Sequence, residues 1–95
     1  KVQKLITPNT RMIILNNPHS PTGTILKAHD FDELYRIVNG TDIMILGDES
    51  LQLLVYDGYE HHSLARKREL AERSFIVGGF GKAFQITGWR VGFCI

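Results

Sequence analysis

The segment SFIVGGFGKAF, residues 74–84, is an apolar run that ends abruptly in glycines and is followed by a lysine. Phe75, Ile76 and Val77 do not alternate with polar residues, so they predict a strand that is covered on both faces. The glycines allow the backbone to turn sharply or to approach a ligand closely. A lysine held at such a turn, away from bulk water, loses its proton more easily and can act as a nucleophile. Lys82 is therefore the first candidate for a functional residue.

Two similar apolar runs precede this segment, at residues 12–15 and 43–46, and they predict two further buried strands. Between them, residues 31–38 carry an apolar stripe with helical spacing. We expect this helix to begin at Asp30, with Glu33 as the partner in a capping box, and to stop at Asn39-Gly40. A second, short helix is predicted over residues 63–73, with Ser63 as its cap.

This alternation of strands and helices predicts the α/β class, with a mainly parallel sheet and helices on both faces. In such sheets, ligands bind outside the carboxyl ends of the strands. Those ends carry the loop of residues 17–20, Asp48, and the glycine-rich turn with Lys82. Three chemically different groups should therefore meet at one edge of the sheet.

The composition excludes several classes of protein. The chain of 95 residues is 43% hydrophobic and 22% charged, as in ordinary globular proteins, and its net charge of +1 gives no attraction to nucleic acid or anionic membranes. No apolar run approaches the roughly 20 residues of a membrane span. The single cysteine, Cys94, excludes an internal disulfide framework and indicates a reducing, cytoplasmic location. Because the chain lacks an initiator methionine and stops within an apparent strand, we expect residues 1–95 to be a fragment of a larger domain.

The candidate residues suit one kind of cofactor chemistry. Lys82 can form a Schiff base with an aldehyde, Asp48 can pair with a protonated pyridine nitrogen, and Arg90 can hold a phosphate. The loop that contains Asn17 and Ser20 would then lie beside the phenolic oxygen of the ring.

Four motifs carry a family resemblance: NPHSPTG at residues 17–23, GDE at 47–49, FGK at 80–82 and TGWRVG at 87–92. Together they resemble the fold-type-I aminotransferases of classes I and II, nearest the methionine and kynurenine aminotransferase branch. The resemblance implies that residues 1–95 are the central segment of the large domain that binds pyridoxal 5′-phosphate (PLP). It also implies a homodimeric enzyme that transfers an amino group between an amino acid and a 2-oxo acid.

The resemblance also assigns individual residues. It implies that Lys82 forms the Schiff base and moves the proton, that Asp48 pairs with the pyridine nitrogen, and that Arg90 binds the phosphate. The remaining cofactor-binding positions that it implies are Asn17, Ser20 and Gly79.

Three positions depart from the family pattern. The family usually has Asn at Ser20, Tyr at Leu51 and Ser at Gly79. Because a neutral hydrogen bond contributes about 0.5–1.5 kcal/mol, we expect these losses to weaken cofactor binding and diminish activity without abolishing them.

Several alternatives stay open. The enzyme could catalyse β-elimination as a carbon–sulfur lyase, or the chain could be a non-catalytic remnant of the fold. Asn17 and Ser20 could simply be turn formers. Glu60, His61 and His62 invite a metal site, but adjacent histidines point in divergent directions. We therefore expect a solvated loop there and no metal.

Overall fold

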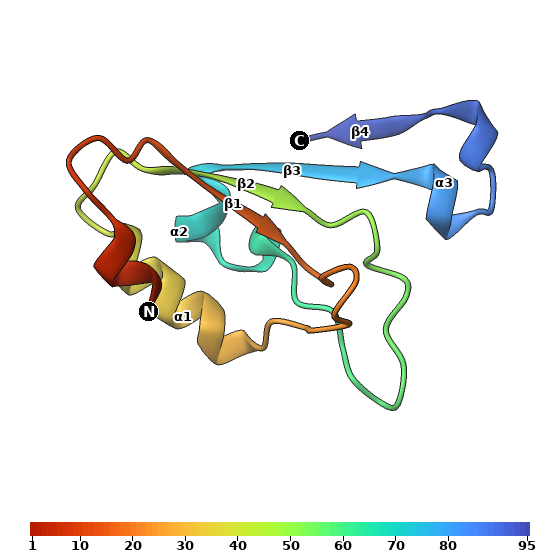
Figure 1. Ribbon diagram of the computed structural model, residues 1–95, viewed down its shortest axis with the longest axis horizontal. Coiled ribbons are helices and arrows are strands. Elements are labelled where there is room, and N and C mark those ends of the chain that lie inside the picture. Colours follow the sequence, from red (N-terminus) through yellow and green to blue (C-terminus); the bar gives the residue numbers. More distant parts are fainter.

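The computed structural model describes residues 1–95 and contains one four-stranded sheet with the strand order β1-β2-β3-β4 (Figure 1). β1 (Met12–Asn16), β2 (Met44–Asp48) and β3 (Ser74–Gly79) are parallel, whereas β4 (Gly92–Cys94) pairs antiparallel with β3. The three predicted strands and the mainly parallel α/β architecture are confirmed. In the register of the sheet, Asn16 lies opposite Asp48, and Asp48 lies opposite Val77. The carboxyl ends of the parallel strands therefore meet at one edge.

The helix α1 (Ala28–Val38) begins two residues before the predicted start. Asp30 is not the N-cap. It lies in the first turn, where its Oδ2 accepts a hydrogen bond from the backbone N of Lys27 at 2.8 Å. The predicted stop is confirmed, since Asn39 follows the last helical residue and Gly40 has a φ of +74°.

The segment predicted as a second helix is divided in two. A 3₁₀ turn (η2, Leu64–Arg66) is followed by the short helix α2 (Arg68–Ala71), and the extended residue Lys67 separates them. Ser63 caps the first part as predicted, because its Oγ accepts a hydrogen bond from the Ala65 amide at 3.1 Å. The remaining short elements are η1 (Val2–Leu5), α3 (Phe80–Ala83) and η3 (Thr87–Trp89).

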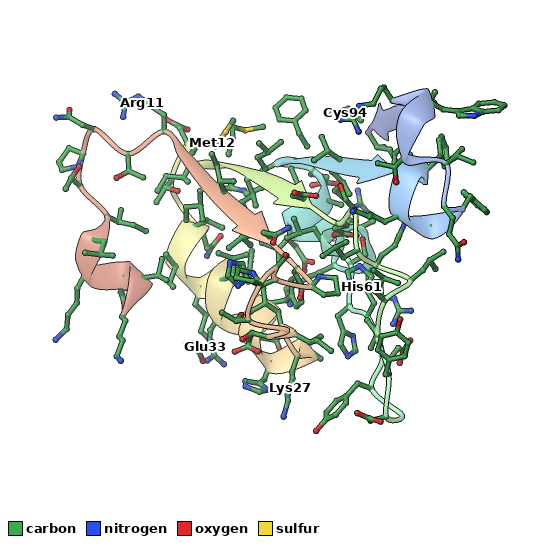
Figure 2. The ribbon with its side chains drawn as sticks, turned by 45° about the vertical axis from the view of Figure 1, so that its right-hand side comes forward. Arg11, Met12, Lys27, Glu33, His61 and Cys94 are labelled. Atoms are coloured by element: carbon green, nitrogen blue, oxygen red, sulfur yellow. The ribbon has the colours of Figure 1, made fainter.

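The hydrophobic core lies between one face of the sheet and α1, η2 and α2 (Figure 1). Its buried side chains are Phe31, Leu34, Val38, Ile43, Ile45, Leu64, Leu70 and Ile76. The opposite face of the sheet is open. There, Met12, Ile14 and Phe75 are 43%, 69% and 45% exposed, and Figure 2 shows Met12 on the side of the sheet away from α1. The sequence predicts helices on both faces of the sheet, whereas residues 1–95 supply helices for one face only.

Two contacts fix the ends of these elements. Nη1 of Arg73 donates to the carbonyl oxygens of Val38, Thr41 and Ile43 at 2.7, 2.9 and 3.3 Å, joining the end of α1 to the start of β2. At the other end, the Phe93 ring of β4 lies so close to Gly78 of β3 that an added Cβ would meet it at 2.2 Å. None of the helices has the length and apolar character needed to cross a bilayer.

Candidate functional site

At the carboxyl end of β3 the chain turns and returns to β4 (Figure 1). A small cavity, open to solvent, lies at this turn. After Gly79 the chain turns into α3, which carries Lys82, and it returns through η3 and Arg90 to β4. The pairing of β3 with β4 therefore brings Lys82 and Arg90 to the same place. The cavity has a volume of about 300 Å³ and is lined by Ser50, Gly79, Gly81, Lys82, Thr87, Arg90, Val91 and Gly92.

The cavity carries positive charge that no protein carboxylate neutralises. Neither Lys82 nor Arg90 takes part in any of the ion pairs of the chain. The only side-chain hydrogen bond of Arg90 runs from Nη1 to the carbonyl oxygen of Thr87 at 3.2 Å. No Asp or Glu lines the cavity. Lys82 and Arg90 are both exposed, so within residues 1–95 the lysine is not held away from bulk water, contrary to the expectation from the sequence. Two cations around one small space can attract an anion, and a guanidinium suits a phosphate in particular.

Asp48 stands next to this cavity without lining it. It is the last residue of β2 and precedes Ser50, a lining residue, by two positions. Its Oδ1 accepts a hydrogen bond from the Ser50 amide at 3.0 Å, whereas its Oδ2 has no partner in the protein. Asp48 thus keeps one carboxylate oxygen available to a ligand.

Asn17 and Ser20 lie on a separate loop and do not line the cavity. Asn17 is only 4% exposed, and both ends of its amide are used. Nδ2 donates to the carbonyl oxygen of His62 at 3.1 Å, and Oδ1 accepts from the Leu26 amide at 2.8 Å. Ser20 is exposed, and its amide donates to Oδ1 of Asn16 at 3.1 Å. The structure therefore gathers Lys82, Arg90 and Gly79, and it gives Asn17 a role in holding loops together.

The structure contradicts the expectation of a solvated loop at His61. The side chain of His61 is only 12% exposed, and its Nε2 lies 3.0 Å from Oε2 of Glu49. The other carboxylate oxygen of Glu49 accepts from the Leu64 amide at 2.9 Å. Figure 2 shows His61 near the carboxyl edge of the sheet, where this pair holds residues 61–64 against the end of β2.

Burial of Glu49 would raise its pKa, but the hydrogen bonds from His61 and the Leu64 amide outweigh burial and hold the pKa below its ordinary value. The continuous apolar run at residues 43–46 gives no sign of which face Glu49 would take, so the sequence did not single out this residue. In the structure, Glu49 continues the alternating series of buried positions Ile43, Ile45 and Gly47, and its side chain points to the same face of the sheet.

Comparison with known proteins places the whole chain in one group. The model of the family "Aminotransferase class I and II" matches residues 1–95. An aromatic-amino-acid aminotransferase of Thermococcus litoralis is 41% identical over 93 residues, which cover 98% of this chain and 24% of that protein.

Solved structures give the same result. A protein of Escherichia coli with a methionine aminotransferase function superposes with a TM-score of 0.95 at 34% identity, over 99% of this chain and 25% of that one. Cystalysin from Treponema denticola, whose crystal structure contains a pyridoxal 5′-phosphate cofactor, superposes with a TM-score of 0.91 at 27% identity, over 99% of this chain and 24% of that one. The chain thus spans about a quarter of the length of the proteins it matches.

Proposed function

The chain belongs to the class I and II aminotransferase family, and we propose that it forms part of the PLP site of an enzyme that transfers an amino group between an amino acid and a 2-oxo acid. The observation that carries this proposal is the cavity at the end of β3. There, an amine and a guanidinium face the same space, and no protein carboxylate neutralises them.

The donor set around the cavity fits PLP. When bound, PLP supplies an aldehyde that reacts with amines and a pyridine ring that acts as an electron sink. Lys82 is the amine of the cavity, and we assign to its Nζ the attachment of the aldehyde and the carriage of the proton that amino transfer moves. Arg90 provides a fork of N–H donors for the phosphate. The free Oδ2 of Asp48 can accept a hydrogen bond from the ring nitrogen.

The proposed site lacks part of the support that the family pattern provides. Leu51 cannot donate a hydrogen bond to the phenolic oxygen, and the serine hydroxyl of Ser20 has a shorter reach than an asparagine amide. Each lost neutral hydrogen bond corresponds to about 0.5–1.5 kcal/mol. We therefore propose that PLP binds more weakly and that activity is lower than in relatives that keep these groups.

The assembly and location are also proposed. A homodimer is what the family resemblance implies, with amino acids and 2-oxo acids as the substrates. A reducing, cytoplasmic compartment agrees with the single free cysteine, Cys94.

Amino transfer is favoured over β-elimination because the Thermococcus litoralis relative is an aromatic-amino-acid aminotransferase and the Escherichia coli protein has a methionine aminotransferase function. The two reactions give different products. Amino transfer yields a new amino acid and a 2-oxo acid, whereas β-elimination of a cysteine conjugate yields pyruvate, ammonia and a thiol.

Product analysis of the protein that carries these residues tests the proposal. We expect amino transfer from an amino acid to a 2-oxo acid in the presence of PLP, and we expect Lys82→Ala to abolish it. Lys4→Ala is the matched control, since Lys4 is an exposed lysine of η1 outside the cavity. Formation of ammonia and pyruvate without amino transfer would favour the lyase. Absence of both reactions, together with absence of PLP binding, would favour the non-catalytic remnant.

A further inference from the structure

Ser50 lines the same cavity as Lys82 and Arg90. Its backbone is fixed, because its amide donates to Oδ1 of Asp48 at 3.0 Å. Its side chain is half-buried, yet the hydroxyl makes no hydrogen bond to any group of the protein. A hydroxyl without a protein partner, in a cavity that Lys82 and Arg90 also line, is therefore available to a ligand.

Gly79 lines the cavity near Ser50. A Cβ added to Gly79 would lie 3.8 Å from Oγ of Ser50 and 4.0 Å from its Cβ, and it would touch nothing closer. The backbone of Gly79 is extended, with φ −138° and ψ 139°, so any residue could adopt it. Neither space nor backbone conformation requires glycine here. Side chains at positions 50 and 79 therefore reach into the same volume.

We propose that the Ser50 hydroxyl binds the phosphate of the cofactor and replaces the serine that the family pattern has at position 79. This inference rests on the proposed PLP site. The hydroxyl and the Arg90 guanidinium line one cavity, so both can donate to the same anion. Ser50, at the end of β2, would supply the hydroxyl group that the family pattern supplies from position 79, at the end of β3. The number of hydroxyl groups around the phosphate would therefore be unchanged.

A hydroxyl that contacts the phosphate and one that contacts the pyridine ring have different effects on ligand binding. A hydroxyl on the phosphate strengthens binding of PLP but leaves binding of pyridoxal, which lacks the phosphate, unchanged. A hydroxyl on the ring affects both ligands equally. The dissociation constants of the two ligands, measured by absorbance or fluorescence titration, therefore distinguish the two contacts without any measurement of activity.

The experiment compares the wild-type protein with Ser50→Ala, Gly79→Ser and the double variant. We expect Ser50→Ala to weaken PLP binding about tenfold or more, as for one hydrogen bond to a charged group, with no change for pyridoxal. Gly79→Ser in the Ser50→Ala background should restore most of the lost affinity. Thr10→Ala is the matched control, because Thr10 precedes β1 at the opposite end of the strands. Circular dichroism checks folding, and Ser50→Cys, a weaker donor of similar size, should bind PLP with intermediate affinity.

Unchanged PLP affinity in Ser50→Ala, or an equal loss for PLP and pyridoxal, would overturn the role of Ser50 while leaving the proposed function in place. A wild-type protein that binds no PLP would overturn both. Binding by the wild type with a loss confined to PLP and a recovery in the double variant would support both.

Discussion

Oε2 of Glu49 lies 3.0 Å from Nε2 of His61, and both side chains are nearly buried, although the two residues are 12 positions apart in the chain. Glu49 directly follows Asp48, the residue proposed to face the cofactor ring. It also accepts a hydrogen bond from the Leu64 amide. The pair therefore fixes the backbone on which Asp48 and Ser50 stand, from the side of the sheet opposite the open face.

Removal of the Glu49 carboxylate should destabilise the protein strongly. In Glu49→Ala, the His61 ring and the Leu64 amide both lose their acceptor. We expect the free energy of unfolding to fall by about 2–5 kcal/mol. Urea denaturation measures it. Glu33→Ala is the control, because Glu33 forms only an exposed ion pair with Arg36, and its loss should be below about 1 kcal/mol. Equal losses in the two variants would contradict the role of the pair.

The stabilisation from Glu49 should depend on pH in one direction. Since the pKa of Glu49 is lowered in the folded state, its contribution is complete above the ordinary value of 4.5 and is lost as the pH falls through the folded value. The wild-type protein should therefore exceed Glu49→Gln in unfolding free energy near neutral pH, and the difference should shrink below about pH 4.5. Denaturation curves between about pH 7 and pH 3 test this window. A difference that stays constant or grows on acidification would be inconsistent with a lowered pKa.

The two neighbouring glycines of β3 should respond differently to alanine. In Gly78→Ala, the new methyl group meets the Phe93 ring at 2.2 Å, whereas in Gly79→Ala it meets only Ser50 at 3.8 Å. We expect Gly78→Ala to cost about 1–3 kcal/mol through displacement of β4, and Gly79→Ala to stay within about 0.5 kcal/mol. Thermal unfolding of both variants compares them. A tolerated Gly78→Ala would mean that Phe93 does not hold β4 in this position.

Arg90 should contribute to binding through the phosphate alone. We expect Arg90→Ala to weaken PLP binding by about 1.5–3 kcal/mol, as for a hydrogen bond to a charged group, and to leave pyridoxal binding unchanged. Arg90→Lys should recover part of the loss, because lysine offers a point charge but no fork of donors. Arg66→Ala, which removes an exposed partner of Glu60, serves as the control. A loss of affinity for pyridoxal in Arg90→Ala would place Arg90 away from the phosphate.

The strands could be predicted from the sequence because the signal is local. Runs of β-branched residues at 12–15, 43–46 and 75–77 form β1, β2 and β3, and Ser63 caps the turn that follows it. The start of α1 was misplaced because the Asp30 carboxylate reaches back to the Lys27 amide from inside the first turn. A carboxylate at the N-cap and a carboxylate in the first turn give nearly the same local pattern in the sequence.

The surroundings of the candidate site could not be predicted in the same way. The proximity of Ser50 to Gly79 depends on the pairing of β2 with β3, in which Asp48 lies opposite Val77. The pair of Glu49 and His61 spans a loop with no regular periodicity. Such contacts follow from register and packing, which no short stretch of sequence encodes. The roles of Glu49 and Ser50, the residues next to Asp48, therefore follow from the folded structure and not from the sequence.

Covalent trapping of the cofactor tests the central proposal most directly. The protein is incubated with PLP and reduced with borohydride, and its peptides are then mapped by mass spectrometry. We predict one major pyridoxyl group, attached to Nζ of Lys82, and its loss in Lys82→Ala but not in Lys4→Ala. Labelling spread over the surface lysines, or labelling that persists when Lys82 is replaced, would contradict the assignment of this cavity as the PLP site.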